Sequence, residues 1–231
     1  MWSSVILGRG APSASGVTKM TYSVKEIFYS LQGEGAHAGR PAIFCRFTGC
    51  NLWSGREKDR TNSICQFCDT DFVGVDGSGG GKFSDAVSLA KTIKTYWPMN
   101  ILGQVAPYLV CTGGEPLLQL DEALIEAFHD EGFEVAIETN GTLPVPDGVD
   151  WVCISPKAGS KCIIEEGDEI KLIYPQHGSH PGDFTTSKFK YFFLQPMCES
   201  GIDNTEITVQ YCLDHPKWRL SLQTHKILGL Q

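Results

Sequence analysis

The sequence predicts an open, partial α/β barrel of mostly parallel strands. Short apolar runs alternate with amphipathic helical segments from Thr21 onward, and apolar strands separated by helices are typical of a parallel sheet buried on both faces. The helical segments are too few for a closed eightfold barrel, in which a helix follows each strand. A length of 231 residues and a hydrophobic fraction of 42% allow a substantial core.

Eight runs are predicted as strands, because each is short, apolar and rich in β-branched or aromatic residues. We expect them to form the wall of the barrel. In chain order they are Val24–Phe28, Ala42–Phe47, Tyr108–Thr112, Glu134–Thr139, Trp151–Ser155, Ile170–Tyr174, Tyr191–Gln195 and Trp218–Thr224.

Three segments are predicted as helices from the spacing of their apolar residues: Asp85–Tyr96, Asp121–Glu131 and roughly Asn204–Asp214. Ser84 is the expected N-cap of the first helix. The second is expected to stop at Gly132, because glycine commonly follows the last helical turn.

The chain is expected to be one domain over residues 20–231, preceded by a disordered extension over residues 1–19. That extension is rich in Ser, Gly and Ala without any period, and either Met1 or Met20 could be the start. The run Gly77–Gly81 predicts a flexible surface loop rather than a phosphate-binding loop.

Charge and cysteine usage exclude several classes of protein. Nineteen Lys and Arg against 27 Asp and Glu give a net charge of −8, which argues against the basic face of a nucleic-acid-binding protein. No apolar run is long enough to predict a membrane span. Nine cysteines cannot all pair as disulfides, so we expect a reducing cytoplasm, where clustered thiols act as ligands or nucleophiles.

Three cysteines form the most informative motif. Cys50 and Cys65 are separated by 14 residues, and Cys65 and Cys68 by two. Two thiolates so close in sequence can bind one metal centre, and the third completes three ligands. Structural zinc, which needs four ligands, and a four-iron cluster with one open iron both remain possible from this spacing. A chance grouping is a poor explanation for three cysteines within nineteen residues.

Polar residues follow four of the predicted strands. Gly113-Gly114, after the third predicted strand, would let the backbone approach a ligand closely or simply form a turn. The other polar strand ends are Glu138–Gly141, Ser155–Lys157 and Gln195–Met197. Because α/β folds gather their ligands at the carboxyl ends of parallel strands, we expect these residues to converge on one site.

Together these motifs resemble the radical S-adenosylmethionine superfamily, and within it the 7-carboxy-7-deazaguanine synthases. The superfamily usually has a shorter spacing between its first two cysteines, and this family shares the 14-residue insertion. The resemblance runs from Met20 to the C-terminus. The matching motifs are Ser30–Gly35, Cys50–Gly55, Cys68–Phe72, Cys111–Pro116, Ser155–Lys157, Gln195–Met197 and Trp218–Lys226.

The resemblance implies a modified radical S-adenosylmethionine core and a homodimeric lyase of queuosine and 7-deazapurine biosynthesis. Such an enzyme converts 6-carboxy-5,6,7,8-tetrahydropterin to 7-carboxy-7-deazaguanine with loss of ammonia. A 4Fe–4S cluster, reduced by a donor such as flavodoxin, cleaves S-adenosylmethionine to a radical that abstracts and later returns a hydrogen. Mg²⁺ assists the reaction, and no side chain acts as a separate catalytic residue.

The resemblance also implies a role for individual residues. Cys50, Cys65 and Cys68 are expected to bind the cluster, and Thr70 the Mg²⁺. The expected contacts of S-adenosylmethionine are Phe67, Cys68, Asp69, Gly114, Ser155, Pro156, Lys157, Gln195, Pro196, Met197 and Cys198. The expected pterin contacts are Leu31, Gln32, Gly33, Arg46, Thr112 and Gln231. Cys198 departs from the acidic residue of the family pattern, so its contact is expected through the backbone.

Two other functions are weighed against this one. A glycyl-radical activating enzyme shares the three-cysteine cluster, but it predicts the shorter cysteine spacing and no Gln-Gly-Glu-Gly segment such as Gln32–Gly35. A zinc-stabilised binding module leaves the four polar strand ends without a purpose. Thr70 could also simply cap its turn through the hydroxyl group.

Overall fold

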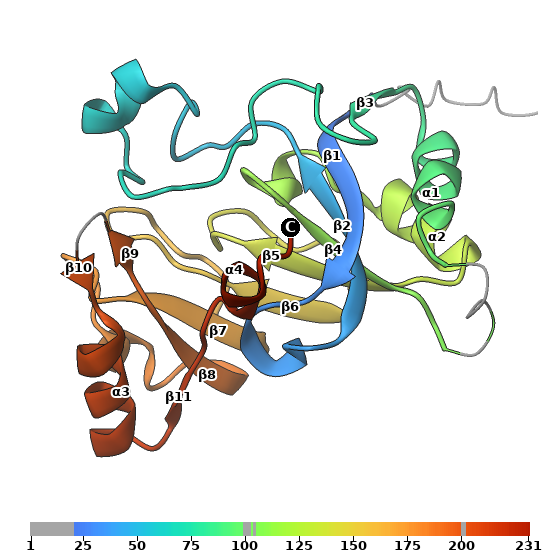
Figure 1. Ribbon diagram of the computed structural model, residues 1–231. Coiled ribbons are helices and arrows are strands. Elements are labelled where there is room, and N and C mark those ends of the chain that lie inside the picture. The colour runs from blue at the N-terminus through green and yellow to red at the C-terminus, as the bar shows by residue number, and fades with distance from the viewer. Residues whose placement is uncertain (1–20, 99–102, 104, 200–201) are drawn as a thin grey trace, which may run out of the picture.

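The computed structural model describes residues 21–98, 103, 105–199 and 202–231, so the extension expected over residues 1–19 lies outside the described residues. Nine strands form one open sheet (Figure 1). In spatial order the strands are β11 (Trp218–Leu220), β8 (Lys188–Pro196), β7 (Glu166–Tyr174), β6 (Trp151–Ile154), β5 (Glu134–Thr139), β4 (Tyr108–Gly113), β2 (Pro41–Phe47), β1 (Tyr22–Leu31) and β3 (Gly81–Phe83).

The seven strands from β11 to β2 are parallel to their neighbours, whereas β1 pairs antiparallel with both β2 and β3. The predicted open, mostly parallel α/β barrel is therefore confirmed. Because parallel strands end on the same edge of a sheet, their carboxyl ends gather the residues that follow them.

Four α-helices accompany the described strands. α1 (Ala86–Lys94) and α2 (Glu122–Asp130) pack against each other and against one side of the sheet, and α3 (Thr205–Asp214) packs on β8 and β11 (Figure 1). The N-cap of α1 is Asp85, whose carboxylate accepts a hydrogen bond from the Ser88 amide, so the prediction of Ser84 was wrong by one residue. A carboxylate reaches the free amides of a first turn as well as a hydroxyl does.

The predicted strand Trp218–Thr224 was too long. β11 ends at Leu220, and the fourth helix, α4 (Thr224–Leu228), begins where the strand was expected to end. The short strand β3 and a two-stranded ribbon of β9 (Cys198–Glu199) and β10 (Ile202–Asp203) were not predicted, because two or three residues show no periodicity.

The glycine run at 77–81 lies against β1 rather than standing free. The Gly77 amide donates to the Lys25 carbonyl at 3.0 Å, and the Ile27 amide donates to the Ser78 carbonyl at 2.7 Å. A Cβ atom at Gly80 would lie 2.2 Å from the Lys25 carbonyl oxygen. Glycine is therefore needed here for close backbone packing, and the expected flexible loop is instead bound to the sheet.

The largest hydrophobic core lies between the sheet and helices α1 and α2. Apolar side chains that alternate along β1, β2, β4 and β5 point toward the helices, which bury Leu89, Leu124 and Phe128 against them. A second core joins α3 to β7, β8 and β11 around Trp218. The opposite face of the sheet forms the inside of the barrel, so its side chains surround whatever the barrel encloses.

An amino-end plug of five polar and aromatic side chains closes the barrel where its strands begin. Tyr108 bonds through its hydroxyl group to His37 Nδ1 at 2.8 Å, and the Arg40 guanidinium lies 3.8 Å from the Tyr108 ring centroid. Arg40 also forms an ion pair with Glu134, and the His37 ring lies 4.0 Å from that of Trp151. No helix within the described residues is long and apolar enough to cross a membrane.

Candidate active site

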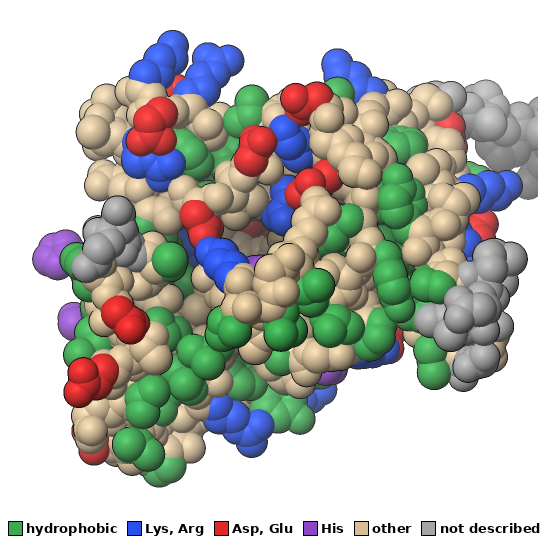
Figure 2. Space-filling model, in the orientation of Figure 1, with side chains coloured by type: hydrophobic (Ala, Val, Ile, Leu, Met, Phe, Trp, Pro, Cys, Tyr) green, Lys and Arg blue, Asp and Glu red, His purple; other side chains and the backbone are tan. Residues whose placement is uncertain are grey.

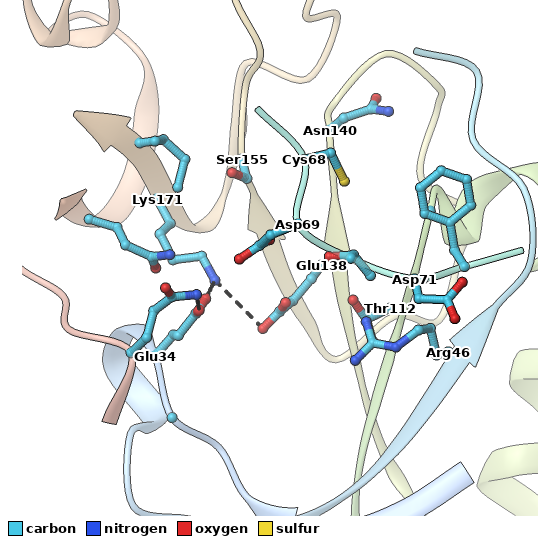
Figure 3. A pocket seen from close by; sticks show the side chains of 18 of the residues that line it. Glu34, Arg46, Cys68, Asp69, Asp71, Thr112, Glu138, Asn140, Ser155 and Lys171 are labelled. Carbon is cyan, nitrogen blue, oxygen red and sulfur yellow. Dashed lines mark hydrogen bonds and ion pairs between the residues drawn. The ribbon is translucent and has the colours of Figure 1, made fainter. Parts of the chain in front are cut away.

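A cavity of about 450 Å³ opens at the carboxyl ends of the parallel strands (Figure 3). It is lined by every residue that the sequence predicted for the site except Pro156. On the face shown in Figure 2, acidic and basic side chains are intermixed rather than gathered into a basic patch. The convergence predicted from the polar strand ends is thus present in the structure.

The 14-residue insertion between Cys50 and Cys65 forms a loop whose two ends are hydrogen-bonded to each other. The Leu52 carbonyl accepts hydrogen bonds from the Ile64 amide at 3.1 Å and the Cys65 amide at 3.3 Å. The insertion contains the 3₁₀ turn η2 (Glu57–Asn62) and returns to its starting point. Cysteines far apart in sequence therefore lie on the same wall of the cavity.

The thiols of these three cysteines are chemically distinct. The Cys65 thiol forms a hydrogen bond with the Cys68 sulfur and lowers the pKa of Cys68 to about 6, an effect that a hydrogen bond from Thr70 reinforces. Burial raises the pKa of Cys50. No three His, Cys, Asp or Glu side chains in the described part of the chain surround one point closely enough to hold a single metal ion. Cys50, Cys65 and Cys68 all line the cavity, and cysteine thiolates are the ligands that hold iron–sulfur clusters.

Three other cysteines lie away from this wall. Cys45 and Cys111 are opposite each other on β2 and β4 and are buried in the core beneath the helices. Cys153 is buried beside Glu169. Burial raises the pKa of all three, so they remain protonated and behave as small apolar side chains.

The glycine pair at the end of β4 is required by the cysteine loop. A Cβ atom at Gly114 would lie 2.1 Å from the Gly49 carbonyl oxygen and 2.8 Å from the Cys50 Cβ. The Gly114 amide donates to the Phe47 carbonyl, and the Glu115 amide donates to the Gly49 carbonyl. The close backbone approach expected toward a ligand is therefore made toward the chain that carries Cys50.

Glu115 joins the ends of β4 and β5 and was not predicted as important. It is fully buried, and its carboxylate accepts hydrogen bonds from the amides of Leu117 and Asn140 and from the Thr139 hydroxyl. Burial raises its pKa. Asn140 in turn donates to Asn51, the residue after Cys50, at 2.9 Å. These bonds hold the cysteine loop against two strand ends.

The strand ends of β6 and β8 carry polar groups suited to an amino-acid ligand. Lys157 donates to the hydroxyl and carbonyl oxygens of Ser155, and burial lowers the pKa of Lys157. Gln195 is 5% exposed, and its side-chain oxygen is buried without a hydrogen-bond partner among the described residues. An orphaned acceptor in a cavity wall fits a bound donor, such as the ammonium group of S-adenosylmethionine.

A charged network that the sequence did not predict forms another wall of the cavity (Figure 3). Lys171, 6% exposed at its side chain, pairs with Glu34 and lies 3.8 Å from Glu138. Gln32 donates to Glu138 at 3.0 Å, and Gln223 donates to Glu34 at 2.8 Å. These five residues come from four separate segments of the chain, so sequence spacing alone could not bring them together.

Gly33 lies beneath a histidine ring, where a Cβ atom would be 2.1 Å from His225 Nδ1. This contact places the start of α4 over the segment that follows β1. The next residue along, Lys226, forms an ion pair with Asp69 of the cysteine loop at 2.7 Å. His225 and Lys226, which directly follow the predicted strand Trp218–Thr224, therefore belong to a helix that borders the cavity.

Arg46 and the C-terminal residue meet at Glu26 on the rim of the cavity. Arg46 Nε donates to Glu26 Oε1 at 2.7 Å, and no partner for its two terminal nitrogens is found within the described residues. Gln231 donates to Glu26 Oε2 at 3.0 Å, and its main-chain oxygen accepts a bond from the Ser30 hydroxyl. Thr112 lies beside Arg46 in the same wall (Figure 3).

No protein-family model matches the sequence, but individual proteins do. The 7-carboxy-7-deazaguanine synthase of Bordetella pertussis is 59% identical over 212 residues, which are 91% of this chain and all of that protein. The synthase of Burkholderia multivorans is 55% identical over the same shares. The crystal structure of QueE from Escherichia coli superimposes with a TM-score of 0.63 at 26% identity and covers 88% of this chain and 94% of that one.

An open barrel with a three-cysteine loop at the carboxyl ends of its strands defines an enzyme of the radical S-adenosylmethionine type. The sequence identity of 55–59% covers 91% of the chain, and both relatives carry the name of the same enzyme. It therefore assigns the chain to one family within that class. The chain belongs to the 7-carboxy-7-deazaguanine synthases.

Proposed function

We propose that this enzyme converts 6-carboxy-5,6,7,8-tetrahydropterin to 7-carboxy-7-deazaguanine with loss of ammonia, in queuosine biosynthesis. The observation that carries the proposal is a cavity whose lining includes the three cysteines of the loop together with Arg46 and Glu138. When bound there, a 4Fe–4S cluster and S-adenosylmethionine would supply the radical that starts the rearrangement. Cys50, Cys65 and Cys68 would hold the cluster.

The chain's own groups would bind and orient the two small molecules. Lys157 and Ser155 offer donors to the carboxylate of S-adenosylmethionine, and the orphaned oxygen of Gln195 offers an acceptor to its amino group. Gly114, Pro196 and Met197 border the same part of the cavity. A walled cavity of this kind keeps water and competing groups away from a reactive intermediate.

Arg46 and Glu138 would recognise the pterin. The planar guanidinium of Arg46 has two terminal nitrogens left for the substrate carboxylate, since only Nε is engaged by Glu26. Gln32 and Lys171 both approach Oε1 of Glu138, and no contact of Oε2 is found within the described residues, so Oε2 would accept from the N–H groups of the ring. Leu31, Gly33, Thr112 and Gln231 complete the proposed pterin wall.

The remaining proposals concern ions and partners. Thr70 would contribute its hydroxyl to a Mg²⁺ ion that is held mainly by substrate oxygens and water, since a neutral hydroxyl is a weak ligand. That hydroxyl donates a hydrogen bond to the Cys68 sulfur, a contact that a capping role also predicts. We further propose a cytoplasmic homodimer that receives its electrons from a flavodoxin-like donor.

The cluster is tested by anaerobic reconstitution of the enzyme and of its Cys65→Ala variant. We expect a brown protein with about four iron atoms per chain, and the loss of both iron and S-adenosylmethionine cleavage in the variant. Cys212→Ala, on α3 and outside the cavity lining, is the matched control and should keep its iron. A full cluster in Cys65→Ala would contradict the ligand assignment, and a colourless protein that binds zinc would favour a structural zinc site.

Substrate recognition is tested by Arg46→Lys, which keeps the charge and loses the planar fork. We expect the KM for the pterin to rise by roughly tenfold or more, because hydrogen bonds to charged groups contribute about 1.5–3 kcal/mol. Cleavage of S-adenosylmethionine without substrate should continue. If that cleavage also stops, Arg46 supports the cysteine loop instead of the substrate.

A further inference from the structure

One guanidinium in the insertion contacts the cysteine loop on both sides of the insertion. Arg60, in the 3₁₀ turn η2, donates from Nη1 to the carbonyl of Gln66 at 2.9 Å and to that of Cys68 at 3.0 Å. Its Cζ lies 4.1 Å from the ring centroid of Trp53, three residues after Cys50. Its Nε bonds to Glu57 at 2.8 Å and fixes the plane of the guanidinium.

Trp53 is itself firmly placed. Its side chain is 7% exposed, its ring meets that of Phe72 edge-on at 5.6 Å, and its Nε1 donates to the Arg56 carbonyl at 3.2 Å. Arg60 therefore joins a fixed ring on the Cys50 side to two carbonyl groups on the Cys65–Cys68 side. These contacts use the flat face and the edge of one group at the same time, which an ammonium group cannot do.

We propose that Arg60 is a positioning residue that fixes the separation of Cys50 from the Cys65–Cys68 turn. The inference rests on the proposed cluster for its functional meaning, but the contacts belong to the chain alone. It gives the insertion a role, because a loop with the shorter spacing has no residue at this place. It also puts a permanent positive charge behind the Cys68 carbonyl, where it would favour the more negative, reduced form of a cluster.

The test compares Arg60→Gln, Arg60→Lys and Lys58→Gln with the parent enzyme. Lys58 is an exposed cation of the same 3₁₀ turn, and no hydrogen bond or ion pair of its side chain is found in the described ranges. It therefore controls for the loss of one positive charge from the insertion. Thermal melting of each variant checks that the barrel has folded.

The first measurement is amide hydrogen exchange over residues 50–70 of the metal-free chain. We expect faster exchange in Arg60→Gln, partial protection in Arg60→Lys, and the parental pattern in Lys58→Gln. The second measurement, on the reconstituted enzyme, is the rate of iron loss to a chelator and the midpoint potential of the cluster. Arg60→Gln should lose iron about tenfold faster or more, since two hydrogen bonds to a charged donor are gone, and should have a lower potential than Arg60→Lys.

Parental exchange and parental iron retention in Arg60→Gln would overturn the proposal. If the parent itself takes up no cluster, the proposed function fails, whereas the exchange measurement still decides the role of Arg60. The two ideas can thus be separated in one set of samples.

Discussion

The two ends of the parallel strands are built in different ways. At the amino ends, the plug of His37, Arg40, Tyr108, Glu134 and Trp151 pairs its polar groups with one another. At the carboxyl ends, by contrast, buried polar groups face a cavity, and one of them, the Gln195 oxygen, has no partner within the described residues. The same strands carry both ends, so the contrast comes from individual side chains rather than from the fold.

The comparison indicates that the carboxyl ends of the strands contain buried polar groups that lower the stability of the fold and are suited to binding a ligand. A buried polar group with a good partner is close to neutral or favourable, whereas one without a partner costs about 1–3 kcal/mol. Groups at the carboxyl ends recover that free energy only when a ligand arrives. We therefore expect changes at the amino ends to affect mainly the free energy of unfolding, and changes of unpaired groups at the carboxyl ends to affect ligand binding. A buried ion pair at the carboxyl ends, such as that of Lys171 with Glu34, should contribute to stability as well.

The largest effect should follow from Gly114→Ala. The new Cβ would lie 2.1 Å from the Gly49 carbonyl oxygen, so the backbone before Cys50 must move. We expect loss of the cluster and a fall in product formation of at least about 100-fold, since small displacements of reacting groups cost this much. Iron content and product per chain measure it.

Gly182→Ala is the matched control for that substitution. A Cβ atom there would meet nothing within 4 Å, so iron content and turnover should remain parental. Retention of the cluster in Gly114→Ala would show that the cysteine loop can move without losing its ligands. It would contradict the idea that changes at the carboxyl ends of the strands disturb ligand binding.

A smaller effect should follow from breaking the charged network with Lys171→Met. Removing one partner of a buried pair leaves an uncompensated charge, which costs about 3–5 kcal/mol. The double variant Glu34→Gln with Lys171→Met removes both charges, and we expect it to recover most of the free energy of unfolding lost by the single variant. Denaturant unfolding of the parent, the two single variants and the double variant measures the coupling free energy between Glu34 and Lys171. If the losses of the two single variants simply add in the double variant, the two residues are not coupled.

The same pair predicts a dependence on pH. Burial alone would raise the pKa of Glu34, but the Lys171 ammonium lowers it from 4.5 to about 2. Since the folded pKa lies below the unfolded one, the pair stabilises the protein above about pH 4.5 and loses this contribution as the pH falls toward 2. In Lys171→Met burial becomes the main influence on Glu34 and raises its pKa, so the sign should reverse: the free energy of unfolding should rise, not fall, as the pH is lowered through that pKa. Glu34→Gln should show neither change.

The smallest effect should come from the amino-end plug. Tyr108→Phe removes the hydroxyl that bonds to His37, at a cost of about 1 kcal/mol or roughly 2–4 °C in melting temperature. We expect kcat/KM for the pterin to stay within about twofold of the parent. A large fall in kcat/KM with unchanged stability would show that the amino-end plug influences the cavity. It would contradict the separate roles proposed for the two ends of the strands.

Much of the fold could be predicted because short stretches of sequence show the apolar pattern of the element that they form. The parallel strands are continuous apolar runs, and helices α1 and α2 carry one apolar face each. The predicted family is confirmed by close relatives. The errors lie at short elements: β11 stops at Leu220 and α4 begins at Thr224, where tertiary contacts with Gly33 decide the backbone.

The candidate site was predictable where motifs are contiguous and hidden where the fold assembles them. The cysteine loop and the polar strand ends lie in the expected cavity, with Pro156 outside its lining. Glu115 lay in the matching motif Cys111–Pro116 without an assigned role, and Lys171 carried no signal, because each acts through residues that are distant in sequence. The roles assigned to individual residues at the cavity remain predictions for the experiments above.

The contact of Gln231 with Ser30 and Glu26 has a practical consequence for anyone producing this enzyme. A purification tag fused after Gln231 would leave from the rim of the cavity, beside α4 and the cysteine loop, and would crowd the opening of the cavity. Kinetic values from C-terminally tagged enzyme should therefore be compared with those of the tag-free chain before they are interpreted.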